Sequence, residues 1–128
     1  MRIARTAALL IVSAWVSLAI AGEIKPYSKV QFDKLSADGK PVLLAIHASW
    51  CPTCKAQKPI VDDLMGEAAY KDVTTLMIDF DGDKALLKQY KVGMQSTLIA
   101  FRGPKEVGRS VGDTTKAGIE GLVKKTVN

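Results

Sequence analysis

The residues of this chain best suited to chemistry are its two cysteines. Cys51 and Cys54 are separated by two residues in the segment WCPTCK. Two thiols at this spacing can close a small disulfide ring, and the pair can switch between dithiol and disulfide. The spacing therefore predicts a redox-active pair.

The residues around the pair predict where it lies in the fold. An apolar run at residues 42–46 predicts a buried strand before it, and the pattern of residues 53–65 predicts a helix after it. Cys51 would then lie beside the unpaired N–H groups and the positive dipole end of that helix. This position favours a thiolate, which is the nucleophile of thiol–disulfide exchange.

Other uses of a cysteine pair fit the sequence less well. A structural zinc site takes four ligands, and the chain offers two cysteines and one histidine, His47, besides carboxylates. Covalent haem attachment takes a histidine where this chain has Lys55. An iron–sulfur cluster takes four thiolates, from one chain or shared by two. A structural disulfide over so short a loop restricts the unfolded chain only a little, so redox chemistry is the favoured interpretation.

The first 21 residues have the pattern of a secretory signal peptide. Arg2 and Arg5 precede an apolar stretch at residues 7–18, and residues 19–21 give the small-x-small pattern of a cleavage site. The apolar stretch is shorter than the roughly 20 residues that a bilayer span requires. We therefore expect cleavage after Ala21 and a periplasmic protein, in a compartment that permits disulfides.

Residues 22–128 have the length of one domain with a single core. Loss of Arg2 and Arg5 lowers the formal net charge of +5 by two. The remaining lysines and arginines alternate with acidic residues along the chain, which is typical of solvated surfaces. No nucleic-acid partner is expected.

The order of predicted elements indicates an α/β fold. A strand–helix–strand unit gives a parallel pair of strands, and two later strands separated by a short turn predict a hairpin. Pro59 is expected to kink the helix that follows the cysteines. Asp113 or Thr114 is expected to cap the last helix. The predicted strands are residues 42–47, 73–79, 97–101 and 107–111. The predicted helices are residues 27–37, residues 53–65 and a short helix after residues 81–83. A last helix is predicted near the C-terminus, with Ile119, Leu122, Val123 and Val127 on one face.

Taken together, these features resemble the thioredoxin family over essentially all of residues 22–128. No single motif is specific, but the motifs occur in the family's order and at compact spacing. They are Trp50 before the cysteine pair, Pro59 five residues after Cys54, Ile78-Asp79 at a strand end, Tyr90 and Val92, the TLIAF strand at 97–101, Gly103 in the hairpin, and Val111-Gly112.

The resemblance implies a thioredoxin fold, with a central mixed β-sheet flanked by helices on both faces, and the activity of a thiol–disulfide oxidoreductase. Cys51 would be the exposed nucleophile, and the more buried Cys54 would resolve the mixed disulfide. Trp50 would shape the surface that meets the substrate. The resemblance further implies a monomer with no cofactor beyond its redox-active disulfide, protein disulfides as substrates and a membrane electron donor.

Three departures from the family pattern affect the expected site. Ser96 stands where the family has a cis-proline, and a cis bond before a non-proline residue costs about 2.5–4 kcal/mol, so we expect a trans or a strained bond there. The Ser96 hydroxyl is a candidate partner for a thiolate or a substrate backbone. Without the proline ring, the cysteines are also more open to capturing a metal ion.

The other departures lie on the strand before the cysteines. Ala45 stands where the family often has a buried aspartate, so proton transfer from Cys54 must use water or another group. His47 stands where the family has an aromatic residue, on the same strand face as Ala45, and is a candidate tuning residue. Pro52-Thr53 between the cysteines also differs from the family's usual Gly-Pro and influences redox poise.

The sequence therefore predicts a periplasmic thiol–disulfide oxidoreductase that reduces disulfides in partner proteins. One alternative is a copper-handling module in which Cys51 and Cys54 bind a soft ion such as Cu(I). Another is a thiol reductase of cytochrome c maturation; those proteins share the WCPTC segment but usually carry additional segments. The third is an adaptor that uses the fold without turnover.

Overall fold

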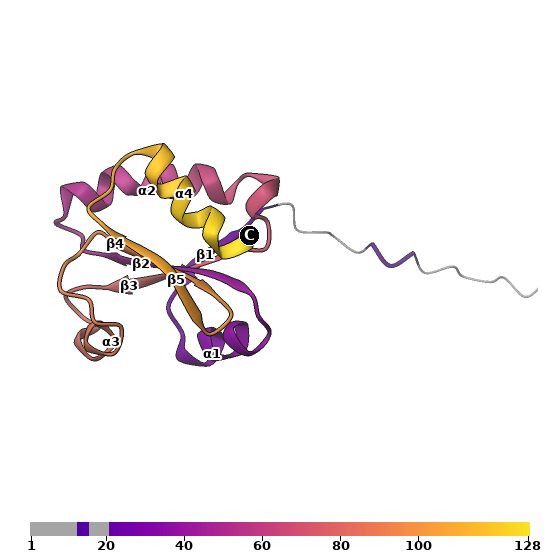
Figure 1. Cartoon of the computed structure of the whole chain (residues 1–128), viewed down its shortest axis with the longest axis horizontal. Helices are drawn as coiled ribbons and strands as arrows, with labels where there is room; N and C mark the ends of the chain where they lie inside the picture. The colour runs from indigo at the N-terminus through magenta and orange to yellow at the C-terminus, as the bar shows by residue number, and fades with distance from the viewer. Residues whose placement is uncertain (1–12, 16–20) are drawn as a thin grey trace, which may run out of the picture.

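The computed structural model describes residues 13–15 and 21–128 (Figure 1). Most of the predicted signal peptide lies outside the described residues, and its cleavage stays a prediction. Within residues 13–15 and 21–128, no helix has the length and apolar character needed to cross a membrane.

One five-stranded mixed sheet forms the centre of the fold, in the order β1-β3-β2-β4-β5. β1 and β2 run parallel to β3, whereas β4 is antiparallel to both β2 and β5. The predicted parallel pair and hairpin are therefore confirmed. The strands are β1 (Glu23–Pro26), β2 (Pro41–His47), β3 (Thr74–Asp79), β4 (Thr97–Arg102) and β5 (Lys105–Val111).

Strand β1 was not predicted from the sequence. Its four residues, EIKP, contain one large aliphatic side chain, Ile24, between two charged residues. Such a segment lacks the alternating or continuous apolar pattern of a strand. It is ordered by pairing with β3 at the sheet edge, where Pro26 is tolerated at the strand end.

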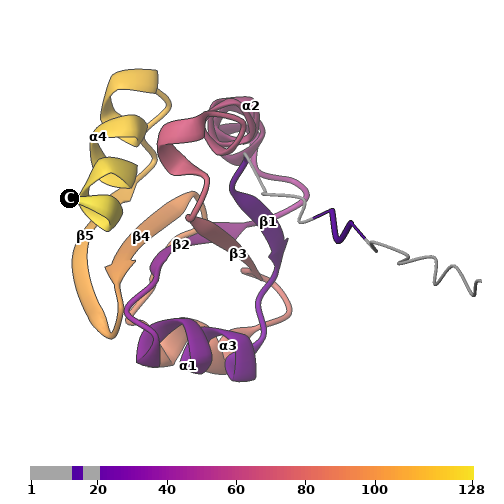
Figure 2. The same ribbon diagram turned by 90° about the vertical axis from the view of Figure 1, so that its right-hand side faces the viewer.

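Helices cover both faces of the sheet, as predicted (Figure 2). α1 and α3 lie on one face, and α2 and α4 lie on the other. α1 begins two residues later than predicted because Ser28 is its N-cap. The helices are α1 (Lys29–Ala37), α2 (Pro52–Met65), α3 (Lys84–Gln89) and α4 (Lys116–Val127), with a short 3₁₀ turn at Ala68–Tyr70.

Strand β2 is apolar on both faces because it lies between the two helical layers. Val42, Leu44 and Ile46 pack in the cluster that α1 and α3 cover. Leu43 and Ala45 pack in the cluster that α2 and α4 cover. This burial fixes the strand, and its last residues lead directly into the cysteine segment.

The start of α4 differs from the prediction. Thr115, and not Asp113 or Thr114, is the N-cap, and its Oγ1 accepts a hydrogen bond from the N–H of Gly118 at 3.1 Å. Asp113 instead accepts hydrogen bonds from the N–H and the hydroxyl of Thr115, at 2.8 and 2.7 Å. These two bonds lower the pKa of Asp113.

The buried face of α4 also differs from the prediction at its C-terminal end. Ile119, Leu122 and Val123 are buried as expected, but Val127 is 41% exposed and Thr126 is buried in its place. The Thr126 hydroxyl donates to the Val123 carbonyl at 2.7 Å. A hydroxyl that is hydrogen-bonded within its own helix can be buried with little loss of free energy. The pattern of apolar residues does not predict such a position.

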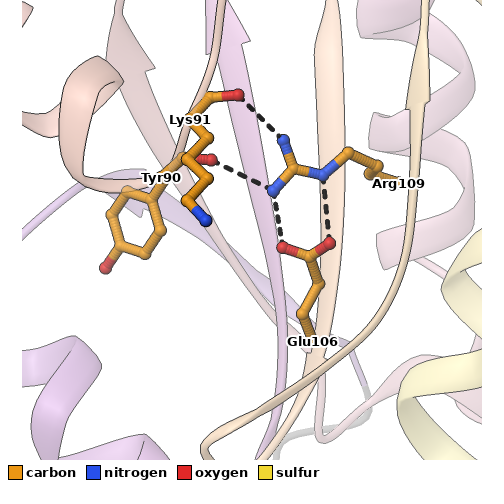
Figure 3. A network of polar contacts seen from close by, with 4 residues as sticks. All are labelled: Tyr90, Lys91, Glu106 and Arg109. Atoms are coloured by element: carbon orange, nitrogen blue, oxygen red, sulfur yellow. Dashed lines mark hydrogen bonds and ion pairs between the residues drawn. The ribbon is translucent and has the colours of Figure 1, made fainter.

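Arg109 of β5 holds the turn that follows α3 (Figure 3). Its guanidinium donates to the carbonyls of Tyr90 and Lys91 at 3.0 and 3.2 Å, and forms two bonds with Glu106 at 2.6 and 3.0 Å. Lys91, which follows the C-cap residue Tyr90, lies in the left-handed region with φ of 55°. The hydrogen bond from Arg109 holds the pKa of Glu106 below its usual value.

The Glu106–Arg109 pair is expected to add pH-dependent stability. Because the pKa of Glu106 is lower in the folded than in the unfolded chain, the contribution is present at neutral pH and is lost as the pH falls through the folded value. Glu106→Gln should therefore lower the free energy of unfolding at pH 7 by less than about 1 kcal/mol, since the pair is partly exposed to solvent. The melting temperatures of variant and wild type should converge once the pH lies below the folded pKa of Glu106. A difference in melting temperature that stays constant down to acidic pH contradicts this assignment.

Candidate active site

The cysteine pair lies at the junction of β2 and α2, as predicted. Cys51 is the N-cap residue of α2, and its Sγ accepts a hydrogen bond from the N–H of Cys54 at 3.1 Å. Pro52 occupies the first turn, where a missing N–H costs nothing. Cys51 and Cys54 form a disulfide with their Cα atoms 5.3 Å apart. α2 continues through the exposed Pro59 to Met65.

The relative exposure of the two cysteines contradicts the sequence-based expectation. Cys51 was expected to be the exposed thiol, but in this disulfide state it is fully buried, whereas Cys54 is 8% exposed. Ala48 and the partly buried Phe80 pack against the pair. Phe80 follows β3 and lies close to the cysteines only through the fold, so sequence spacing did not reveal it.

Trp50 is half exposed beside the pair, and an acidic residue orients its ring. The indole Nε1 donates to Oδ2 of Asp81 at 2.7 Å. Asp81 lies in the loop after β3, and the sequence pattern indicates only a turn there. This bond fixes a large apolar surface next to Cys51.

Ser96 lies in the loop before β4, with a trans peptide bond before it. There is no cis peptide bond in the described part of the chain, and Ser96 instead adopts a left-handed conformation with φ of 56°. Its N–H donates to the Ile46 carbonyl at 2.8 Å, which joins the loop to the end of β2. Its hydroxyl donates to the Gln95 carbonyl at 2.6 Å, so it is not directed at the disulfide.

Gln57 was not predicted as a site residue, yet it holds this loop. Its side chain is 5% exposed, and Nε2 donates to the carbonyls of Ser96 and Asp113 at 3.1 and 2.8 Å. The N–H of Gly112 donates to the same Ser96 carbonyl at 3.0 Å. A buried glutamine in an otherwise apolar helix face was the available sequence signal.

Removing this amide is expected to destabilise the protein. Gln57→Met keeps the side-chain length but leaves a carbonyl without its donor, which should lower the free energy of unfolding by about 1–3 kcal/mol. Urea denaturation followed by circular dichroism measures this loss. Lys58→Met, at the exposed neighbouring position, is the matched control and should change stability by less than about 0.5 kcal/mol. Equal losses of stability in the two variants would mean that the hydrogen bonds of Gln57 to the Ser96 and Asp113 carbonyls do not stabilise the fold.

His47 and Ala45 lie on the same face of β2, as predicted. Both line a cavity of about 270 Å³ between the sheet and α2, and Cys54 lines it as well. Ile24 of β1 and Met77 of β3 contribute to its largely apolar wall. Residues 13–15 and 21–128 contain no cluster of three or more histidine, cysteine or acidic side chains arranged to hold a metal ion.

Comparison with known proteins identifies the family. A family model described as Thioredoxin matches residues 23–125. A thioredoxin of Chlamydia trachomatis is 38% identical over 84 residues, which cover 66% of this chain and 80% of that protein. A thioredoxin of Chlamydia pneumoniae is 33% identical over 102 residues, which cover 80% of this chain and 97% of that protein.

A solved structure agrees with these relatives. The crystal structure of Trxlp from Edwardsiella tarda matches with a TM-score of 0.75 and 39% identity, over 77% of this chain and 97% of that one. The sheet order, the helices on both faces and the cysteine pair at the start of α2 are consistent with this likeness. The chain therefore belongs to the thioredoxin family and is a thiol–disulfide oxidoreductase with the cysteine pair Cys51–Cys54.

Proposed function

We propose that the protein is a monomeric periplasmic reductant of disulfides in partner proteins, with Cys51 as nucleophile and Cys54 as resolving cysteine. The observation that carries the assignment of roles is the hydrogen bond from the Cys54 N–H to Cys51 Sγ. An N–H donor at a helix N-terminus stabilises negative charge on this sulfur more than on one inside the first turn. Cys51 is therefore the better thiolate.

The reaction proceeds in two exchange steps. The Cys51 thiolate attacks one sulfur of the substrate disulfide, and the other substrate sulfur leaves as a thiolate. The Cys54 thiolate then attacks Cys51 Sγ, forms the Cys51–Cys54 disulfide and releases the second substrate thiolate. The substrate gains two electrons and two protons, and a membrane donor returns them to the protein.

Exposed apolar side chains around the pair support a protein substrate. Trp50, Met94 and Val111 are 54%, 54% and 56% exposed. Trp50 precedes Cys51, Met94 lies in the Ser96 loop, and Val111 pairs with Thr97 at the end of that loop. Exposed apolar groups close to a reactive sulfur suit a polypeptide that docks around its own disulfide. For the buried Cys51 to reach a substrate sulfur, side chains packed against the cysteine pair, among them Phe80, must move.

Trapping of substrates tests the assignment of roles. Cys54→Ser should complete the first step only, so that substrate proteins stay bound to Cys51 through a disulfide and are released by dithiothreitol. Cys51→Ser/Cys54→Ser is the matched control and should retain nothing. Trapping by Cys51→Ser but not by Cys54→Ser would reverse the two roles.

Export tests the proposed location. The full chain produced in a Gram-negative bacterium should be recovered in the periplasmic fraction with Gly22 as its first residue. Replacing Leu9 and Leu10 with arginine interrupts the apolar stretch and should keep the protein in the cytoplasm. Recovery of the uncleaved chain in the cytoplasm of the wild type would refute a periplasmic function.

A further inference from the structure

The cavity behind the cysteine pair connects Cys54 to His47. Its volume of about 270 Å³ is enough for several water molecules, each of which occupies about 30 Å³ in the liquid. Cys54 lines it and Cys51 does not. Cys54 is also the cysteine with measurable exposure, at 8%. The cavity therefore borders the resolving cysteine and not the nucleophilic one.

The small side chain of Ala45 leaves this space open and supplies no acid–base group. Asp62 is the one carboxylate among the lining residues, and it is paired with Lys58 at 2.7 Å on the outer side of α2. Imidazole is the side-chain group whose ordinary titration falls between about pH 5 and 8. His47 carries the one imidazole among the residues that line this cavity.

We propose that His47 accepts the proton of the Cys54 thiol, through water in this cavity, when the mixed disulfide is resolved. This inference rests on the dithiol cycle proposed above. The neutral imidazole takes the proton, and the Cys54 thiolate attacks Cys51 Sγ. The new bond joins the two cysteine sulfurs, the bond from Cys51 to the substrate sulfur breaks, and the substrate leaves as a thiolate that takes up a proton.

The surroundings of His47 allow the proton to leave again. His47 also lines a second, more open hollow with Asp79 and Asp83, and it pairs in register with Asp79 on β3. His47 therefore borders acidic groups on its open side, to which a proton can pass through solvent. The charged and titratable groups that line the two cavities are Lys55, Lys58, Asp62 and Cys54 on α2, Lys25 and Tyr27 from β1 and the segment after it, and Asp79 and Asp83 from the end of β3 and the loop after it.

The test follows the mixed disulfide directly. The reduced protein is mixed with oxidised glutathione, quenched with acid and analysed by mass spectrometry, which separates the glutathionylated protein from the intramolecular disulfide. In His47→Gln the resolution step at pH 7 should slow by about 100-fold, the low end for general-base catalysis, so that the mixed disulfide accumulates. In the wild type the rate at which the mixed disulfide resolves should fall as the pH is lowered, because protonation of the imidazole removes the proton acceptor.

Two further variants separate proton transfer from a general disturbance of the site. In a Cys54→Ser background, which stops after the first step, His47→Gln should leave the rate of glutathionylation unchanged. Adding Ala45→Asp to His47→Gln places a carboxylate on the same strand face and should restore rapid resolution. The wild-type pH profile supplies an independent readout if the variants fold poorly.

The outcomes distinguish this proposal from the one on which it rests. If His47→Gln resolves the mixed disulfide as fast as the wild type from about pH 5.5 to 8.5, His47 is not the proton acceptor. If the rate at which the wild type resolves the mixed disulfide does not change with pH over this range, His47 is likewise not the proton acceptor. If Cys54→Ser forms no mixed disulfide at all, the dithiol cycle itself is wrong.

Discussion

We expect the wild type to catalyse the reduction of insulin by dithiothreitol, and Cys51→Ser to abolish this catalysis. The serine hydroxyl is not ionised at neutral pH and cannot form a mixed disulfide, so the first exchange step is lost. The helix N-terminus remains intact, because serine is a good N-cap residue and can accept the same hydrogen bond from residue 54. Turbidity of the precipitating insulin B chain measures the rate.

A matched substitution shows whether the loss is chemical. Thr53→Ser changes a partly buried side chain between the cysteines and leaves both thiols in place, so it should retain most of the activity. Thermal melts of both variants should confirm that they fold. Full insulin reduction by Cys51→Ser would contradict the mechanism.

Leu43→Ala is expected to cause a large loss of stability. Leu43 is fully buried on the central strand and packs in the cluster under α2 and α4. Its truncation removes apolar contacts and leaves a cavity in a layer fixed by two helices, which costs about 3–5 kcal/mol. Equilibrium unfolding in urea measures the difference in the free energy of unfolding.

An exposed aliphatic residue provides the control for this loss. Val30 on α1 is 81% exposed, so Val30→Ala should change the free energy of unfolding by less than about 0.5 kcal/mol. A cost at Leu43 that is similar to the cost at Val30 would mean that β2 is not the centre of the core.

The main elements were predictable because each has a strong local pattern. The apolar run of β2 has no solvent-facing position, and α2 combines an apolar face with a capping residue at its start. Strand β1 was missed because four residues with one large aliphatic side chain carry no such pattern. It is ordered by pairing with β3, which no local property of its residues encodes.

The site was predicted where a residue's role follows from its place in the chain, and missed where the role depends on a distant partner. The position of the cysteines at the helix start follows from the strand and helix that flank them. Asp81 accepts a hydrogen bond from Trp50, Phe80 packs against the disulfide, and Gln57 donates to the Ser96 carbonyl. All three contacts join residues from different elements of the fold. Because each of these residues is far from its partner in the sequence, no local pattern indicates its role.

The order of cysteine exposure could not be predicted for the same reason. The resemblance to the thioredoxin family implied an exposed Cys51, and that expectation holds only if no side chain packs against it. Here Cys51 is fully buried in the disulfide state, in a cluster with Ala48 and Cys54 against which Phe80 packs. The Nζ of Lys84 lies over the ring of Phe80, 4.6 Å from its centroid.

The reduction potential of the Cys51–Cys54 pair is the most direct test of the central claim that this protein reduces disulfides. The pair can be equilibrated against glutathione in metal-free buffer and followed by the fluorescence of Trp50, because the other tryptophan, Trp15, lies in the predicted signal peptide. We expect a value at or below about −220 mV, in the range of reductants. A value of about −180 mV or higher, typical of isomerases and oxidants, or a pair that does not titrate would contradict the account.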